Sequence, residues 1–354
     1  MLMPYILTVL MTNRCTAKCA HCCMNSGPDR SERLDFPVIR KTIDELNDIS
    51  PLLTVVFAGG EPTLVKDALR QSIRHCSEIG ISTRLVTNAS WAKTPSTARR
   101  VLKRLKADGL RELNISTDDY HLPFIPFENV VNAWSAAKEM VFDSVVIANS
   151  VGPSSQITPE CIKKRIGERV PLRFDEDGIE HVAPAADADG TYYAISNSQL
   201  QRLERGAATL SDSDFHLMSD ISRLNAPCPY AIRNAALSAR GSLLACCGFE
   251  LDGNEVLDFG DVRTTNAARL IEKANNDVII NAIAYFGPLF LMKIVKKVAP
   301  DVSFSKKFGS VCEICRSVVK NPDAILALRE HVSAFGPVVI RRRMKVAKHN
   351  QEAA

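Results

Sequence analysis

The sequence predicts an α/β fold in which a parallel sheet is covered by helices. Over residues 3–188, short apolar runs alternate with amphipathic stretches. Such alternation gives parallel strands that are joined by right-handed crossovers. In addition, chemically suggestive residues follow directly after four of the apolar runs. Because active sites gather at the carboxyl ends of parallel strands, we expect one functional site at that edge of the sheet.

The strands and helices of this first part can be assigned from hydrophobic spacing and helix-end residues. Strands are expected at 5–11, 53–57, 82–86, 112–116 and 144–148, with a last strand region at 170–184. Helices are expected at 36–49, 66–79, 95–108, 127–140 and 158–167. Gly80 ends the second helix, and Thr94-Pro95 supplies the cap and first turn of the third.

Composition indicates an ordinary globular protein. The 354 residues are 46% hydrophobic and 24% charged, with a formal net charge of +4. A chain of this length can bury a large core and form a main domain plus a smaller one. Basic residues gather at 341–348, where they could contact an acidic partner or nucleic acid. A solvated tail is the simpler interpretation, and nucleic acid is not an expected partner.

We expect a cytoplasmic protein without a membrane span. The first residues lack a basic region and a small-residue cleavage site. The apolar stretch 278–295 is interrupted by Asn281, Gly287-Pro288 and Lys293, so it predicts a buried helix pair or a pocket wall. Eleven cysteines without an export signal point to metal ligation in a reducing compartment.

Three cysteines stand close together after the first apolar run. Cys15, Cys19 and Cys22 have the spacing C-x3-C-x2-C. Thiolates so close in sequence cannot bridge each other without strain, but they can converge on one metal centre. Three ligands leave one iron of a 4Fe-4S cluster open to a cosubstrate. A zinc knuckle, or chance clustering among eleven cysteines, is the alternative.

This spacing, with the ring residue His21 just before the last cysteine, resembles the signature of the radical S-adenosylmethionine (radical SAM) enzymes. The resemblance implies a partial (β/α)6 TIM-like barrel. It also implies that Cys15, Cys19 and Cys22 bind a 4Fe-4S cluster, whose open iron binds S-adenosylmethionine. Cys23 is extra, and we interpret it as a packing or shielding thiol.

The ends of later strands fit this resemblance. Gly59-Gly60-Glu61 is similar to the Gly-Gly-Glu motif of the family, which implies that Glu61 offers a carboxylate to the ammonium group of the cosubstrate. Ser116 and Asp118 resemble the ribose-binding Ser-x-Asp pair, and His21 the residue that packs near the adenine. Asn88 is a further cofactor-binding candidate. A turn at the glycines and a strand-end cap at Asn88 are the structural alternatives.

Three more residues, Asp119, Tyr120 and His121, follow the fourth strand and are candidates for catalysis. They could face the substrate or transfer a proton, for which histidine is well suited near neutral pH. The same run is also good capping and loop chemistry. The Gly-Arg pair that many family members carry after the last strand is missing from 184–188, so no role is assigned there.

A second cysteine set follows in the other half of the chain. Cys228 is separated by twelve residues from Gly241 and then by four from Cys246, across an expected β-hairpin that turns at Gly241. Cys312 and Cys315 add a C-x2-C pair. The pattern resembles the SPASM and twitch extensions of one radical SAM branch, and four thiolates suffice for one auxiliary 4Fe-4S cluster. The twitch type fits better, because no cysteine follows Cys315.

Alternatives remain for this second set. A zinc ribbon could use the same four thiols. Cys247 could replace Cys246, although Cys246 keeps the family spacing. Cys76 and Cys161 lie on expected helices and are interpreted as buried thiols.

We therefore expect four regions. They are a radical SAM barrel at 1–190, a helical connector at 191–227 with a helix near 197–208, a twitch-like α+β domain at 228–320, and a C-terminal helix with a basic tail at 321–354. An insert at 260–310 is expected to contain two helical stretches.

The resemblance implies an oxidoreductase that cleaves S-adenosylmethionine reductively to a 5′-deoxyadenosyl radical, which abstracts hydrogen from a substrate. The leading hypothesis is a maturase of a ribosomally made precursor peptide (RiPP maturase), since this branch contains many. The first strand begins close to residue 1, so we expect a separate leader-recognition protein, and a reductant such as flavodoxin or ferredoxin. The alternatives are a small-molecule dehydrogenase or cyclase, and a non-catalytic zinc or iron-sulfur module.

Overall fold

The computed structural model describes residues 1–172, 187 and 190–352, and its centre is one continuous sheet. Nine strands are hydrogen-bonded in the order β6-β5-β4-β3-β2-β1-β7-β8-β9. Strands β1 to β6 are parallel throughout. Their bounds are Ile6–Leu10, Thr54–Ala58, Ser82–Thr87, Glu112–Ser116, Ser144–Val151 and Tyr192–Gln199.

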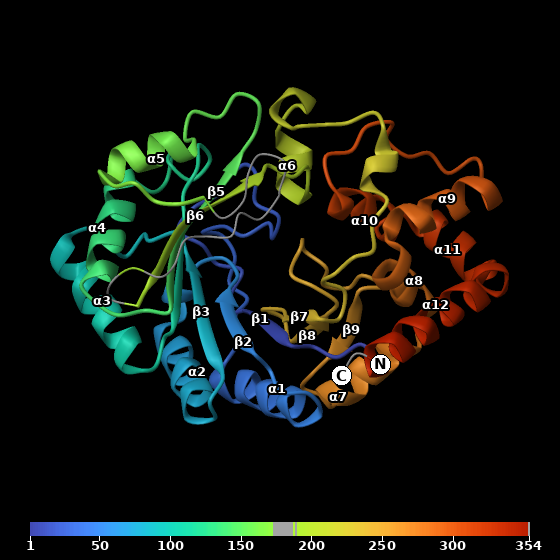
Figure 1. Cartoon of the computed structure of the whole chain (residues 1–354), viewed down its shortest axis with the longest axis horizontal. Coiled ribbons are helices and arrows are strands. Elements are labelled where there is room, and N and C mark those ends of the chain that lie inside the picture. Colours follow the sequence, from blue (N-terminus) through green and yellow to red (C-terminus); the bar gives the residue numbers. More distant parts are fainter. Residues whose placement is uncertain (173–186, 188–189, 353–354) are drawn as a thin grey trace.

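One helix follows each of these six strands, which makes the first part a partial (β/α)6 barrel. The helices are α1 (Phe36–Ile49), α2 (Lys66–Glu78), α3 (Pro95–Ala107), α4 (Phe127–Lys138), α5 (Pro159–Ile166) and α6 (Glu204–Thr209). Helices α1 to α4 lie along the outer side of the strands, as Figure 1 shows. The predicted α/β class with a parallel sheet and a partial barrel is confirmed, and the first five strands and helices lie where the sequence placed them. The twitch-like iron-sulfur domain stays a prediction.

Local chemistry explains where the helices begin and end. The side chains of Thr94 and Thr158 accept hydrogen bonds from the backbone N–H groups of Thr97 and Cys161, and a proline follows each cap. Proline is favoured in a first turn because its fixed φ suits the helix and its missing N–H would have no helical partner. Helix α5 ends at Gly167, whose φ of 74° is a left-handed conformation that glycine adopts without strain.

The sixth strand differs from the expectation. Of the strand region expected at 170–184, residues 173–184 lie outside the described residues, and Leu172 forms an isolated bridge with Ile195 of β6. The strand described here, Tyr192–Gln199, pairs with the whole of β5. The helix expected near 197–208 is therefore wrong at its start, because pairing with β5 keeps residues 197–199 extended and α6 begins at Glu204. The sheet thus continues beyond residue 190, where we expected the barrel to end.

The second half of the chain extends the same sheet. Strand β7 (Asn234–Leu237) pairs in parallel with β1, and β8 (Ser242–Leu244) returns antiparallel to β7, so the expected hairpin is confirmed. Its turn residue Gly241 has a φ of 94°. Strand β9 (Asp258–Asp261) then pairs with β8. Because β7 pairs with β1, the two halves of the chain share one sheet.

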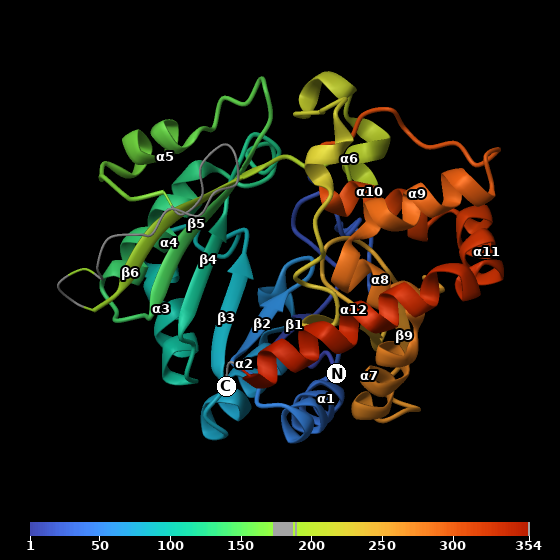
Figure 2. The ribbon, with the colours of Figure 1, turned by 45° about the vertical axis from the view of Figure 1, so that its right-hand side comes forward.

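The remaining helices form a separate layer beside β7 to β9, on the right of Figures 1 and 2. They are α7 (Ala267–Asn276), α8 (Val278–Phe286), α9 (Pro288–Val298), α10 (Val311–Val319), α11 (Pro322–Glu330) and α12 (Val332–Glu352). The insert 260–310 therefore contains three helices, not two, because Gly287-Pro288 divides the apolar stretch into α8 and α9. Among the described residues, none of the helices is long and apolar enough to cross a membrane.

Candidate functional site

The first cysteine set lies in the loop between β1 and α1. Cys15 and Cys19 are buried, and Cys22 is half-buried. The backbone N–H of Cys15 donates to the carbonyl of Gly27, and that of Cys22 to the carbonyl of Cys19. Burial, opposed by a backbone hydrogen bond and reinforced by neighbouring groups, raises the pKa of Cys15 to about 12. All three thiols line one cavity of about 510 Å³.

The two glycines after β2 let this loop approach the sheet. The N–H of Gly60 donates to the carbonyl of Thr12 over 2.6 Å, and the N–H of Glu61 to that of Arg14 over 2.9 Å. A Cβ at Gly59, whose φ is 124°, would lie 2.6 Å from the carbonyl oxygen of Thr12. A Cβ at Gly60 would overlap the carbonyl of Arg14. The Gly-Gly pair thus permits close contact with the cysteine loop itself.

Glu61 connects the same turn to the end of β3. Its carboxylate is fully buried and accepts hydrogen bonds from the Thr63 backbone and side chain, the Thr87 hydroxyl and the Asn88 backbone. Burial raises the pKa of Glu61, and these donors oppose that rise. Glu61 therefore connects the turn after β2 to the end of β3 through buried hydrogen bonds. Its expected role toward an ammonium group stays a prediction.

Asn88 links the end of β3 to the cysteine loop. Its side-chain amide donates to the sulfur of Cys15 over 3.5 Å and to the hydroxyl of Thr16 over 3.1 Å. Asn88 also lines the cavity, as do Gly59 and Gly60. The amide is thus placed to orient the Cys15 sulfur, and binding of a cofactor by Asn88 stays a prediction.

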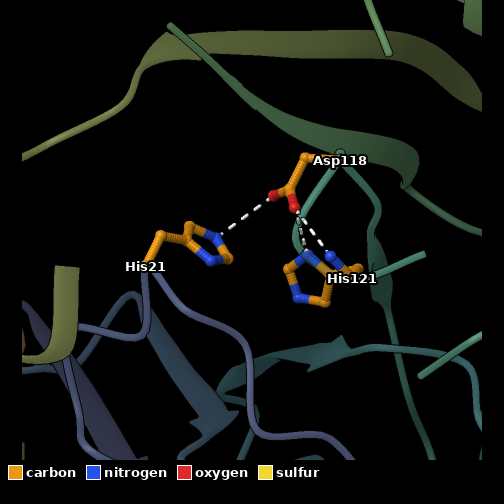
Figure 3. A group of neighbouring side chains, drawn as sticks. All are labelled: His21, Asp118 and His121. Carbon is orange, nitrogen blue, oxygen red and sulfur yellow. Dashed lines mark hydrogen bonds and ion pairs between the residues drawn. The ribbon is translucent and has the colours of Figure 1, made fainter. Parts of the chain in front are cut away.

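The side chains of His21, Asp118 and His121 lie together, as Figure 3 shows, and the two histidines line the cavity. The Asp118 carboxylate is almost fully buried and lies 3.2 Å from His21 Nε2 and 2.9 Å from His121 Nδ1. It also accepts the backbone N–H groups of Tyr120 and His121. Burial alone would raise the pKa of Asp118, but the two histidines hold it well below its usual value.

Of the other residues at the end of β4, some line the cavity and some bind the loop before α5. Ser116 and His121 line the cavity. The Tyr120 ring stacks on His21, with 5.0 Å between the ring centres. The Asp119 carboxylate accepts the backbone N–H groups of Gln156 and Ile157, so it fastens the loop before α5. The catalytic roles of Asp119, Tyr120 and His121, and ribose binding by Ser116 and Asp118, stay predictions.

The second cysteine set reaches the same cavity. Cys228, Cys246 and Cys312 line it, and Cys315 is buried nearby on α10. A Cβ at Gly248 would lie 3.6 Å from the Cys246 sulfur and 3.9 Å from the Cys312 sulfur, so these two thiols converge around a residue without a side chain. Burial, together with the nearby Cys228 and Cys247, raises the pKa of Cys312 to about 12. Cys23 and Cys247 also line the cavity.

The spacing of the sulfurs can be compared with the two kinds of metal centre. Across the described residues, which include all eleven cysteines, no three cysteine sulfurs lie within 4.8 Å of one another. One tetrahedral zinc ion, with Zn–S bonds of about 2.3 Å, would hold its sulfurs roughly 3.8 Å apart. Three thiols that line one cavity at each set are donors of the kind that an iron-sulfur cluster requires, and zinc accepts the same donors.

Helix α6 holds the cysteine loop from the other side. The Arg205 guanidinium donates to the carbonyl of Cys19 over 3.0 Å and to that of Ser26 over 2.7 Å. The hydroxyl of Thr209 donates to the carbonyl of Ala20 over 3.1 Å. These partners are 179 to 189 positions apart in the chain, so no local sequence pattern could have indicated them.

Glu204 joins α6 to the helix that carries Cys312 and Cys315. Its carboxylate accepts hydrogen bonds from Arg316 over 3.0 Å and Lys320 over 2.7 Å, and its other oxygen lies 3.5 Å from the Asn25 amide. Glu204 is buried and has a φ of 39°, which is uncommon for a residue with a side chain. Figures 1 and 2 show α6 between the barrel strands and α10.

Part of this chain is similar to a known family, and the chain is similar to several known proteins. The model of the Radical SAM superfamily matches residues 9–154. A Bacillus subtilis protein named for peptide biosynthesis, YydG, is 18% identical over 322 residues, which are 90% of this chain and 93% of that protein. The PqqA peptide cyclase of Bradyrhizobium diazoefficiens is 36% identical over 114 residues, which are 32% of this chain and 28% of the cyclase.

Solved structures give a weaker likeness. SuiB from Streptococcus suis, bound to S-adenosylmethionine, is matched over 81% of this chain and 69% of that chain. The sequence identity is 16% and the TM-score is 0.45.

Substitution of Gly60 by alanine tests the contact between the two loops. We expect Gly60→Ala to displace the cysteine loop, because its Cβ would overlap the Arg14 carbonyl. Iron bound after anaerobic reconstitution should fall to the level of a variant in which Cys15, Cys19 and Cys22 are alanine. Gly336→Ala is the control, since its Cβ would make an ordinary 3.7 Å contact with Val278. Iron binding by Gly60→Ala at the level of this control would contradict the assignment.

Substitution of Glu204 tests the joint between α6 and α10. Glu204→Ala leaves Arg316 and Lys320 without their shared carboxylate, so we expect a loss of about 1–3 kcal/mol in the free energy of unfolding by urea. Glu160→Ala, which removes an exposed pair with Lys163, should cost less than about 1 kcal/mol. If the two substitutions lower the free energy of unfolding equally, the contacts of Glu204 do not stabilise the packing of α6 against α10.

Proposed function

We propose that the chain is a radical SAM oxidoreductase that cleaves S-adenosylmethionine reductively and abstracts hydrogen from a precursor peptide. The match of residues 9–154 to the model of the Radical SAM superfamily supports this proposal. The observation that carries this proposal is the shared cavity, because Cys15, Cys19 and Cys22 line it together with Cys228, Cys246 and Cys312. A substrate in this cavity would lie beside both cysteine sets.

The relatives support a peptide as the substrate. The relative that spans 90% of this chain is named for peptide biosynthesis, and the partial match to PqqA peptide cyclase covers 28% of that enzyme. We infer a RiPP maturase. A separate leader-recognition protein, and flavodoxin or ferredoxin as the reductant, complete this proposal, and we place the enzyme in the cytoplasm.

The residues of the first set fit a 4Fe-4S cluster. Cys15, Cys19 and Cys22 would hold it, and when bound it supplies the electron that cleaves S-adenosylmethionine to a 5′-deoxyadenosyl radical. Asn88 orients the Cys15 sulfur through its amide, and Arg205 fixes the backbone at Cys19.

We propose further roles for the residues after β4 and for the second cysteine set. Ser116 and Asp118 would bind the ribose, with Asp118 also holding His21 and His121 in place. His121, with Asp119 and Tyr120 beside it, would orient the substrate or transfer a proton. Cys228, Cys246, Cys312 and Cys315 would bind an auxiliary 4Fe-4S cluster of the twitch type, which would accept an electron from the substrate or hold it.

The proposal is tested by product formation in the reconstituted, reduced protein. We expect about eight irons per chain for two clusters, and formation of 5′-deoxyadenosine from S-adenosylmethionine. Replacing Cys15, Cys19 and Cys22 with alanine should abolish 5′-deoxyadenosine and leave about four irons. Zinc alone, without cleavage of S-adenosylmethionine, would refute the proposal.

A further inference from the structure

Asn88, directly after β3, uses both polar atoms of its side chain in hydrogen bonds. Its amide nitrogen donates to the Cys15 sulfur over 3.5 Å and to the Thr16 hydroxyl over 3.1 Å. Its side-chain oxygen accepts the backbone N–H of Ser90 over 3.0 Å. Asn88 and Cys15 are both buried. Because water screens charges less at buried positions, the contact between the amide and the sulfur is electrostatically strong.

The neighbours of this amide determine its orientation. The backbone N–H of Ser90 can only donate, so the side-chain oxygen of Asn88 must face it. The amide nitrogen then faces the Cys15 sulfur. The opposite orientation would place two donors against each other at Ser90 and two acceptors against each other at a Cys15 thiolate. A donor therefore faces the sulfur.

The backbone after Asn88 is held in an uncommon conformation. Ala89 is fully buried and has a φ of 58°, a left-handed conformation that is rare for a residue with a side chain. Its N–H donates to the Thr87 hydroxyl over 3.1 Å, and the N–H of Asn88 donates to the Glu61 carboxylate over 3.0 Å. Such a conformation persists only where the surroundings determine it, and it is concentrated at functional sites. The amide of Asn88 thus has a fixed position beside the sulfur.

We propose that Asn88 is a positioning residue that raises the reduction potential of an iron-sulfur cluster on Cys15, Cys19 and Cys22, through the hydrogen bond from its amide to the Cys15 sulfur. This inference rests on the proposed function, which places a cluster on these three thiolates. Hydrogen bonds to the sulfurs are among the factors that set the potential of such a cluster, and partners of metal ligands tune the metal.

The direction of the effect follows from the charge that reduction adds. The cluster takes up one electron from the reductant, flavodoxin or ferredoxin, and in this step no proton is transferred and no bond is broken. Part of the added negative charge spreads onto the cysteine sulfurs. The positive end of the Asn88 N–H dipole points to one of them, so it stabilises the reduced state more than the oxidised state.

A second donor faces the same sulfur and can be kept constant. The backbone N–H of Ala17 donates to the Cys15 sulfur over 3.5 Å. This donor remains when the side chain of Asn88 is changed, so the contribution of the Asn88 amide can be removed by itself. If Asn88 only closed the turn at Ser90, any side chain that closes this turn would keep the reduction potential.

The variant Asn88→Ser separates these two roles. A serine hydroxyl can still accept the Ser90 N–H, as it does in similar turns, but it has no amide for the Cys15 sulfur. A redox titration of the full reconstituted protein, followed by electron paramagnetic resonance, measures the midpoint potential of the first cluster. Its signal is the one missing from the variant without Cys15, Cys19 and Cys22. We expect Asn88→Ser to weaken reduction about tenfold, which lowers the midpoint of a one-electron couple by about 59 mV.

Two further variants complete the titration. Asn88→Asp keeps the acceptor for Ser90 and replaces the donor by a charged oxygen, so the midpoint should fall further than in Asn88→Ser. Asn132→Ala is the control, because its amide donates to the Ala92 carbonyl of the same loop over 2.9 Å, and the midpoint should stay at the wild-type value. A wild-type midpoint in Asn88→Ser, or an equal fall in Asn132→Ala, would overturn the inference.

The hydrogen bond also has a spectroscopic signature. Electron nuclear double resonance of the reduced protein, with an isotopic label on the side-chain nitrogen of asparagine, should show coupling between this nitrogen and the electron spin of the cluster. The coupling should disappear in Asn88→Asp, whose side chain has no nitrogen. Only molecules that carry a cluster contribute, so a variant that binds less iron still gives an answer. A wild-type spectrum without this coupling would contradict the inference.

The outcomes distinguish the inference from the proposed function. If the wild-type protein forms 5′-deoxyadenosine and Asn88→Ser keeps its midpoint, the proposed function stands and the inference fails. If the reduced wild-type protein gives no signal that depends on Cys15, Cys19 and Cys22, the proposed function fails at its first step and the inference fails with it.

Discussion

The structure depends on the close contact between the cysteine loop and the turn after β2. Two backbone hydrogen bonds, from the N–H of Gly60 to the carbonyl of Thr12 and from the N–H of Glu61 to that of Arg14, join the turn after β2 to the loop after β1. This approach is possible because neither glycine carries a Cβ. Glu61 then extends the contact to β3 through Thr87 and Asn88, and Asn88 returns to the Cys15 sulfur. The cysteine loop acquires a fixed position in this way, because hydrogen bonds tie it to the ends of β2 and β3 as well as to β1.

Helix α6 supplies the second constraint, because it contacts both cysteine sets. Arg205 holds the backbone of the first set, and Glu204 pairs with Arg316, the residue directly after Cys315. Arg202, just before α6, pairs with Glu313 between the two cysteines of α10. The two cysteine sets are thus connected through buried or half-buried ion pairs, whose partners are costly to separate. This explains how segments about three hundred positions apart in sequence can line one cavity.

Much of the barrel could be predicted from the sequence, because parallel strands that are buried on both faces and helices with one apolar face leave regular patterns. The first five strands and helices, and the hairpin at Gly241, follow such patterns. The sixth strand does not, since Tyr192–Gln199 ends in four consecutive polar residues and is extended through pairing with β5. Likewise, the pairing of β7 with β1 depends on the tertiary fold, so local patterns do not predict it. This pairing joins two regions that the local patterns indicate as separate domains.

In the candidate site, too, some features could be predicted from the sequence and others could not. A common location at one edge of the sheet could be predicted for two groups of residues. The first group is the closely spaced Cys15, Cys19 and Cys22, and the second is the strand-end residues Gly59, Gly60, Ser116 and Asp118. The partners of Glu61 and Asp118, and the joints at Glu204 and Arg205, could not be found from sequence because they depend on contacts between distant segments.

The central claim is that two iron-sulfur centres face one cavity, and electron paramagnetic resonance of the fully reduced protein tests it most directly. Two nearby paramagnetic clusters should broaden each other's signals and shorten each other's relaxation times. The spectrum should therefore differ from the sum of two reference spectra, one from a variant without Cys15, Cys19 and Cys22 and the other from a variant without Cys228, Cys246, Cys312 and Cys315. A spectrum equal to that sum, or a signal from one cluster alone, would contradict the account.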